Sequence, residues 1–374
     1  MLKGKNKSRA IQIALFLATL LSTTLTGAFH QSGDPFNFSN LPSGLYFSLS
    51  FLAILTIHEF GHYLTARYYK ANVSLPYFIP FIPVVLGTMG AFIRIKSRLR
   101  SKKEIFDIGI AGPLAGFVAA LIILYYGFTH LPPAEYIYNY HPEYQQYGLD
   151  YPMYVYKDAE RIQASLKIGD NLIFLFFKNF VVSDPSRIPT DYEMMHYPFL
   201  WAGYFALFFT ALNLLPIGQL DGGHILYGLV GARLQRKISP VIFAMFVYIG
   251  GLGVFTMPTI YEDFIPVHSM DNFLIFTVVY LGFLYIVFSR VSIRPLNNFL
   301  IALAVFSAQL VTGLLFPDVK GFLGWLIFAA IIGKFIGIYH PPAEIEEELD
   351  TKRKVLGWIS FVVFILCFTP NPIE

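Results

Sequence analysis

The chain has 374 residues, of which 55% are hydrophobic and only 14% are charged, with a formal net charge of +3. Because a soluble domain carries about 25% charged residues, this composition excludes a soluble globular protein and predicts an all-α polytopic membrane protein. The single cysteine, Cys367, excludes an intrachain disulfide and a cysteine-based zinc site.

Apolar runs in the sequence predict the transmembrane helices. A helix needs about 17–25 predominantly apolar residues to span a bilayer. Such runs lie near residues 11–29, 45–66, 105–127, 197–217, 238–257, 272–289, 296–316, 321–339 and 355–370. The last run is short, so the sequence predicts about eight or nine spans.

Lysine and arginine predict the orientation of these spans. With the N-terminus inside, 20 of the 27 basic residues fall in inside segments and six in outside segments. Since basic residues favour the cytoplasmic side, we expect the N-terminus and the basic loops to be cytoplasmic. The first run also fits a signal peptide, but it is long for one and residues 20–28 offer no Ala-x-Ala cleavage site. The N-terminus lacks the richness in Arg and Ser of a transit peptide, which favours a bacterial inner (cytoplasmic) membrane.

An H-E-x-x-H motif lies within the second apolar run. Residues four apart share one face of a helix, so His58 and His62 can hold one metal ion together. Glu59 is placed to act on a water molecule as general base. Soluble zinc proteases carry this motif on a helix in a water-filled cleft, whereas the flanking residues 46–66 are those of a membrane span. The motif therefore predicts hydrolysis inside a bilayer.

A catalytic zinc site usually has three protein ligands and a water, so a third ligand is needed. Asp221 is the best candidate, because it follows a long apolar run that Pro216 and Gly218 interrupt. Ionisable groups at membrane depth are costly and usually functional. The alternative role of Asp221, a helix N-cap, is compatible with ligation. His224 follows three residues later, and on a helix it is either a neighbour of the site or an extra ligand.

The remaining histidines are expected to lie outside the site. Those in or beside loops are predicted to be polar surface residues: His30, His130, His141, His268 and His340. His196 precedes an apolar run and is predicted to lie at the membrane interface.

Residues 67–104 separate the second and third runs and predict a β-hairpin. Within them, Gly87–Lys96 ends in alternating apolar and basic residues, the period of a strand with one wet face. Beside a membrane-embedded site this is a re-entrant hairpin, which requires protein or a water cavity around its backbone. A free strand edge there can pair with an unwound peptide. An ordinary cytoplasmic hairpin is the alternative.

On these residues the chain resembles the site-2 protease family of intramembrane zinc metalloproteases, in the branch without a PDZ domain. The resemblance covers about residues 45–232, and its motifs are His58–His62, Gly87–Ala91, Phe106–Gly116 and Asn213–Gly223. It implies that His58, His62 and Asp221 bind one zinc ion per chain. It also implies that Glu59 is the general base and that Asn213 lies near the reacting carbonyl as a catalytic residue.

The expected function is hydrolysis of peptide bonds within or near the transmembrane segments of membrane proteins. The expected partners are substrates with a transmembrane helix and the lipid bilayer, with no nucleic acid. A non-proteolytic membrane scaffold or a metal-transport protein of the same fold is the alternative. Transport needs repeated acidic or histidine pairs, which residues 238–339 almost lack, and a scaffold is free to lose Glu59.

We expect three parts along the chain. Residues 1–44 form an N-terminal span and loop, residues 45–232 form the metalloprotease core, and residues 233–374 form a C-terminal transmembrane bundle of unknown role. Within the core, residues 128–196 are a polar insertion rich in Tyr and Pro, which is too short for a PDZ domain with linkers. Leu172–Phe180 in this insertion is expected to be an amphipathic element on the membrane.

Overall fold

The structure is a computed structural model that describes residues 2–32, 38–81, 86–157, 166–255 and 270–373. It is helical apart from one small β-hairpin. The main helices are α1 (Leu2–Ser32), α2 (Leu41–Tyr68), α3 (Lys102–Thr129), α7 (Pro198–Leu214), α8 (Asp221–Gly250), α9 (Met270–Phe288), α10 (Pro295–Leu315), α11 (Leu323–Ile331) and α12 (Thr351–Cys367). A helix therefore lies on each predicted apolar run.

These helices differ in their capacity to cross a membrane. Four in the described ranges are long and apolar enough to do so, namely Asn6–Gln31, Leu41–Tyr68, Lys102–Thr129 and Pro295–Leu315. Shorter apolar helices cover Pro198–Leu214, Phe273–Phe288 and Leu323–Ile336. The predicted class, a helical membrane protein with a small hairpin, is confirmed.

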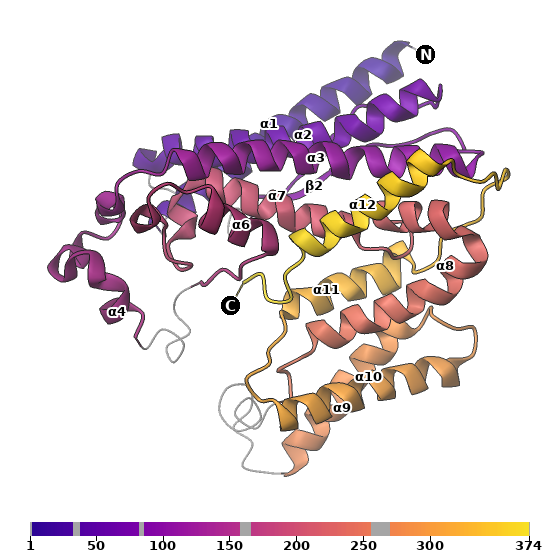
Figure 1. The fold of residues 1–374 in the computed structure, drawn as a ribbon. Helices are drawn as coiled ribbons and strands as arrows, with labels where there is room; N and C mark the ends of the chain where they lie inside the picture. Colours follow the sequence, from indigo (N-terminus) through magenta and orange to yellow (C-terminus); the bar gives the residue numbers. More distant parts are fainter. Residues whose placement is uncertain (1, 33–37, 82–85, 158–165, 256–269, 374) are drawn as a thin grey trace.

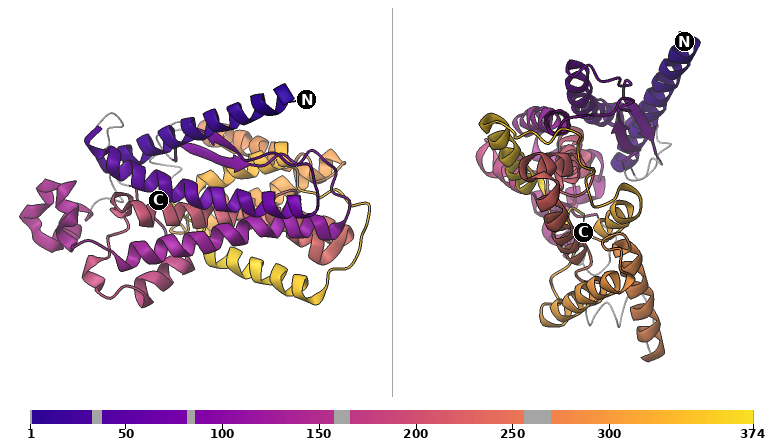
Figure 2. Two further views of the ribbon diagram at one scale, coloured as in Figure 1. Left: turned by 90° about the horizontal axis from the view of Figure 1, so that it is seen from above. Right: turned by 90° about the vertical axis from the view of Figure 1, so that its right-hand side faces the viewer.

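The helices form two bundles, which Figure 1 shows one above the other. Helices α1, α2 and α3 lie side by side in one layer, with α7 and the start of α8 against α3. The later part of α8 packs with α9, α10 and α11 in the second bundle. Helix α12 returns to the first bundle and packs against α7 (Figures 1 and 2).

Helix α3 begins at a capping box. The Ser101 hydroxyl accepts from the Glu104 backbone N–H at 3.1 Å, and the Glu104 carboxylate accepts from the Ser101 N–H at 3.5 Å. These bonds satisfy backbone donors that the first turn of a helix leaves free. The cap fixes the start of α3 and hence the register of the residues that α3 presents to α2.

The hairpin consists of strands β1 (Tyr77–Pro80) and β2 (Thr88–Phe92), which pair antiparallel. It lies against α1, where the Ser22 hydroxyl donates to the Gly87 carbonyl at 2.6 Å. Gly87 has φ 69°, a left-handed conformation that glycine adopts without strain. Because Ser22 belongs to the apolar part of α1, Gly87 at the start of the second arm of the hairpin lies beside a candidate span, as expected for a re-entrant hairpin.

The described part of the insertion between α3 and α7 is built from short helices, and the part with α4 (Tyr151–Val155) projects from one end of the molecule (Figures 1 and 2). They are η2 (Ala134–Asn139), η3 (Pro142–Asp150), α4 (Tyr151–Val155), α6 (Leu172–Phe180), η4 (Pro185–Arg187) and η5 (Met194–His196). The predicted element at residues 172–180 is helix α6. Helix α6 buries Phe174 and Phe177 and exposes Phe180. One of its faces therefore packs against the protein, and the other is exposed. Two further short elements are η1 (Phe38–Asn40) and η7 (Ile332–Ile336).

Candidate functional site

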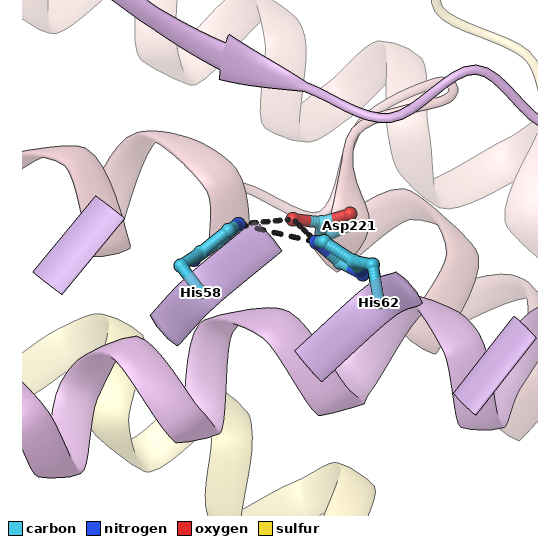
Figure 3. A group of neighbouring side chains, drawn as sticks. All are labelled: His58, His62 and Asp221. Carbon is cyan, nitrogen blue, oxygen red and sulfur yellow. Dashed lines mark hydrogen bonds and ion pairs between the residues drawn. The ribbon is translucent and has the colours of Figure 1, made fainter. Parts of the chain in front are cut away.

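The structure brings together three side chains from two distant segments. His58 and His62 lie one turn apart on α2, and their Nε2 atoms are 3.1 Å apart. Asp221 is the first residue of α8, and its Oδ2 lies 3.5 Å from His58 Nε2 and 3.2 Å from His62 Nε2. Figure 3 shows all three groups directed at one point. We call this set the inner triad.

The inner triad has the geometry of a metal site. Tetrahedral ligands about 2.0–2.1 Å from a zinc ion lie about 3.3–3.4 Å from one another. The three separations, 3.1, 3.5 and 3.2 Å, are close to that value. Both histidines are buried. Two imidazole nitrogens and a carboxylate oxygen are ordinary zinc ligands, so these residues fit the ion.

Helix α3 fixes the orientation of the histidines. The Ile108 carbonyl accepts from His62 Nδ1 at 2.7 Å, which leaves the lone pair on Nε2 for a metal. A Cβ atom on Gly112 would lie 2.1 Å from His62 Nε2, and one on Gly116 would lie 3.0 Å from His58 Cβ. Two glycines of α3 therefore make room for the triad, which gives the Phe106–Gly116 motif a physical role.

Asp221 reaches the site because the chain turns sharply between α7 and α8. Helix α7 ends at Leu214, and Gly218 in the turn has φ 59°. A Cβ on Gly222 would lie 2.0 Å from the Leu214 carbonyl oxygen, so only glycine permits this close packing. The N-cap of α8 is Leu220, and the alternative role of Asp221 as N-cap is therefore wrong.

The inner triad borders a cavity of about 330 Å³. The cavity is lined by His58, Glu59, His62, Ala91, Phe92, Ile93, Ile95, Ile108, Gly109, Asn213, Gln219, Leu220, Asp221 and His224. Glu59 is buried, and Ile93 lines the same cavity. Asn213 Nδ2 lies 3.4 Å from His58 Nε2. The five residues predicted for the site thus surround one cavity, and the end of the hairpin forms one wall.

His224 lies on the cavity but outside the group of potential metal ligands found in the described residues. Its Nδ1 lies 2.8 Å from Nε2 of His340. Burial lowers the pKa of His340 to about 4, so this ring is neutral at pH 7. Since the Pro341 carbonyl accepts from His340 Nδ1 at 2.6 Å, His340 Nε2 accepts from His224. His224 is thus oriented by a residue beyond α11.

The prediction of surface positions holds for only some of the other histidines. His130 is exposed, as expected. His30 and His340 are buried, which corrects the prediction for both. His141 is half-buried and lies against buried His196. His268 lies outside the described residues.

The buried positions of these histidines follow from packing between segments far apart in the chain. His340 contacts a residue 116 positions earlier, and His141 and His196 are 55 positions apart. No local spacing signals such contacts. The spacing Gly109, Gly112 and Gly116, three and four residues apart on a helix, is the one local signal that marks a face of close approach.

Comparison with known proteins shows the family to which the chain belongs. Residues 46–257, more than half of the chain, match peptidase family M50. The chain is 34% identical over 215 residues to "Probable zinc metalloprotease EGY1, chloroplastic" of Oryza sativa subsp. japonica, covering 55% of this chain and 31% of that protein. It is 32% identical over 204 residues to the Arabidopsis thaliana protein of the same name, covering 53% of this chain and 31% of that one.

A second group of relatives gives the same result. The chain is 28% identical over 211 residues to "Probable zinc metalloprotease EGY2, chloroplastic" of Oryza sativa subsp. indica, covering 56% and 33% of the two chains. The chain thus spans about a third of the length of these curated relatives. No solved structure matches it significantly. The match over residues 46–257 confirms the resemblance found in the sequence: the chain belongs to peptidase family M50, the site-2 protease family.

Proposed function

We propose that the protein is an intramembrane zinc endopeptidase that hydrolyses peptide bonds within or near transmembrane segments of membrane proteins. The observation that carries the proposal is the inner triad beside Glu59 on one cavity, in a chain with candidate membrane spans. Family membership and the zinc metalloprotease names of the relatives support it.

In this proposal His58, His62 and Asp221 hold the zinc ion. When bound, the ion supplies Lewis acidity, which activates a water and polarises a carbonyl group. The chain contributes the fixed geometry, since α3 orients His62 through the Ile108 carbonyl. The ligands come from α2 and α8, so the site forms only when both helices are in place.

Glu59 acts as the general base in this proposal. Its carboxylate faces the same cavity as the triad, where it accepts a proton from the attacking water and passes it to the leaving amine. Asn213 donates a hydrogen bond from its amide to the developing oxyanion. Its amide nitrogen lies 3.4 Å from His58 Nε2, which supports a place beside the reacting atoms.

The hairpin presents the substrate in this proposal. A transmembrane helix hides its carbonyl groups in its own hydrogen bonds, so the cleaved segment must unwind. Strand β2 pairs only with β1 in the described part of the chain, and residues at its end line the cavity. An extended peptide paired with the other edge of β2 would lie along the cavity.

The distribution of basic residues supports an orientation with the N-terminus and the active-site side in the cytoplasm. We further propose that this membrane is a bacterial inner membrane. The relatives are named as chloroplast proteins. We also propose residues 45–232 as the catalytic core and residues 233–374 as a C-terminal transmembrane bundle of unknown role, whose last helix, α12, packs against α7 of the core.

The test is cleavage of tagged single-span membrane proteins that are co-expressed with the full chain, followed by mass spectrometry of the fragments. The wild type should produce fragments, and Asp221→Ala should produce none. The full chain purified in detergent should also lose a zinc ion in Asp221→Ala. If cleavage persists in Asp221→Ala, the proposal is wrong. Zinc uptake into proteoliposomes without any cleavage would favour the transport alternative.

A further inference from the structure

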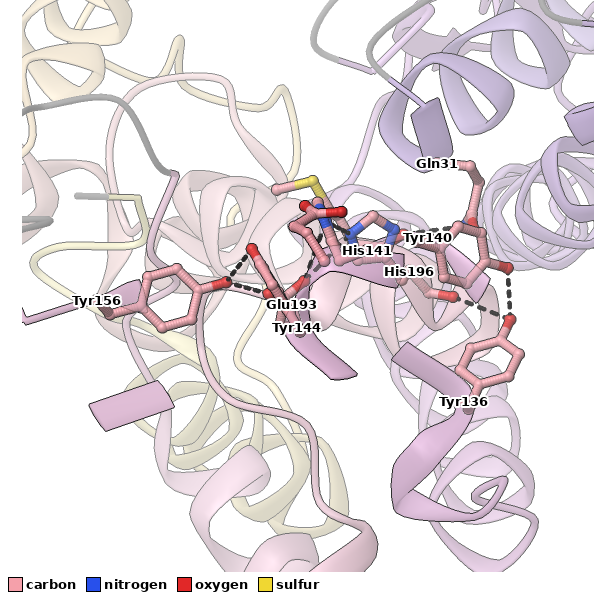
Figure 4. Close-up of polar contacts among 10 residues, drawn as sticks. Gln31, Tyr136, Tyr140, His141, Tyr144, Tyr156, Glu193 and His196 are labelled. Atoms are coloured by element: carbon pink, nitrogen blue, oxygen red, sulfur yellow. Dashed lines mark hydrogen bonds and ion pairs between the residues drawn. The ribbon is translucent and has the colours of Figure 1, made fainter. Parts of the chain in front are cut away.

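A second cluster of histidine and carboxylate side chains lies in the insertion, far from the inner triad in sequence. His141 directly precedes η3. Glu193 directly precedes η5 and His196 is its last residue, just before α7. The Nε2 atoms of the two histidines are 3.2 Å apart. Glu193 Oε2 lies 3.1 Å from His196 Nε2 and 3.8 Å from His141 Nε2. Figure 4 shows the three groups converging. We call this set the outer triad.

The outer triad repeats the geometry of the inner one. Ligands on a tetrahedral zinc ion are separated by about 3.3–3.4 Å. The separations in the outer triad are 3.2, 3.1 and 3.8 Å. Within the described residues, these two sets alone have three potential ligand atoms within 4.8 Å of one another. Both sets consist of two histidines and one carboxylate.

The outer triad has fewer N–H donors than acceptor atoms. His141 Nδ1 lies 3.1 Å from Glu143 Oε1, and with the proton on Nδ1 the lone pair of His141 Nε2 faces the cluster. His196 Nδ1 is buried and has no hydrogen-bond partner among the described residues, so without a metal the proton of this ring serves Nε2. One N–H then faces two acceptors, His141 Nε2 and Glu193 Oε2. A cation at the centre would bind all three ligand atoms together, and the proton of the His196 ring would then lie on Nδ1.

The surroundings hold the outer triad in place. The Glu193 side chain is only 2% exposed, and its Oε1 accepts from the Tyr156 hydroxyl. Tyr140 stacks on His196 at 4.6 Å between ring centroids, and Tyr144 stacks on His141 at 4.5 Å. Such partners orient the ligands of a metal and tune their basicity.

From this geometry we infer that His141, Glu193 and His196 form a second metal site, which takes a divalent transition ion such as zinc. Two imidazoles exclude the hard ions calcium and magnesium, which prefer oxygen ligands. The His141 side chain is 31% exposed, which leaves an open side for a water as fourth ligand. The site joins the segment at His141 to the start of α7. None of its three residues lines the cavity that contains Glu59.

The test is the zinc content of the full chain purified in detergent, measured by mass spectrometry. The wild type should hold about two ions per chain, and His141→Ala and Asp221→Ala should each hold about one. His130→Ala is the matched control, because His130 is an exposed histidine of the same region, and it should hold as much zinc as the wild type. One ion in the wild type that only Asp221→Ala removes would overturn the second site and leave the proposed protease intact. One ion that only His141→Ala removes would overturn the inner metal site instead.

A second measurement guards against loss of metal through misfolding. Zinc added to metal-free Asp221→Ala protein should raise its thermal midpoint by about 3 °C at saturation, since a ligand that binds only the folded state stabilises it. The double variant Asp221→Ala with His141→Ala should unfold cooperatively and show no rise. An equal rise in both proteins would contradict the assignment.

Discussion

The inner and outer triads share ligand types and spacing but differ in what surrounds them. His58, His62 and Asp221 face a cavity of about 330 Å³ that also holds Glu59 and Asn213. The outer triad is enclosed by tyrosine rings, and its carboxylate is bonded to the Tyr156 hydroxyl. Ligand geometry alone marks a candidate metal site, whereas a general base and room for a substrate beside it mark a candidate active site.

Exchanging a carboxylate for an amide in each region gives the sharpest contrast. Glu59→Gln removes the general base and should slow cleavage about a thousandfold, while the zinc content stays that of the wild type. Glu193→Gln should have the reverse effect, with one zinc ion lost and cleavage retained. Fragment formation from a co-expressed single-span protein and the zinc content of the purified chain are the two measurements. Unimpaired cleavage by the Glu59→Gln variant would show that Glu59 is not the general base.

Gly112→Ala tests whether the close packing of α3 against His62 supports the inner triad without affecting the outer one. The added Cβ would lie 2.1 Å from His62 Nε2, so the ring must move away from the metal position. We expect zinc affinity at the inner site to fall about ten- to a hundredfold and the outer site to be unchanged. The control is Gly282→Ala in α9, where an added Cβ meets nothing within 4 Å. Competition with a zinc chelator measures both affinities, and equal values in the two variants would contradict this role of α3.

Tyr156→Phe should produce the smallest effect, and only at the outer site. It removes the hydroxyl that donates to Glu193, so zinc affinity there should fall about tenfold. Tyr154→Phe, at an exposed tyrosine of the same segment, should leave both sites unchanged. The same chelator competition applies, carried out in the Asp221→Ala background so that only the outer site contributes. A shift of equal size in both variants would show that the hydroxyl does not orient the carboxylate.

Much of the fold and of the inner site follows from local sequence. A helix carries each apolar run, because length and hydrophobicity determine what can span a bilayer. His58 and His62 meet because residues four apart share a helix face. Asp221 was identified because a carboxylate after a long apolar run is costly unless it is used. The hairpin followed from the alternation of residues near Ile93–Lys96, although β2 itself ends at Phe92.

The outer triad and the contact of His340 did not follow from sequence. They depend on how loops fold back over helices, with partners 55 and 116 positions apart. The propensities of tyrosine and proline in the insertion say little about such packing. For the same reason His30, predicted on the surface, is buried instead. Contacts of this kind are set by the packing of the whole molecule.

The segment between α11 and α12 has a practical consequence for engineering. The family match ends at residue 257, yet His340 bonds to His224 at 2.8 Å, and Arg353 bonds to Asp107 of α3 at 2.7 Å. A shortened chain that stops after the family match would keep every residue proposed for catalysis but leave the Asp107 carboxylate, which is 16% exposed, without its cation, and this destabilises the fold. A minimal version for crystallisation or inhibitor screening must therefore extend through α12.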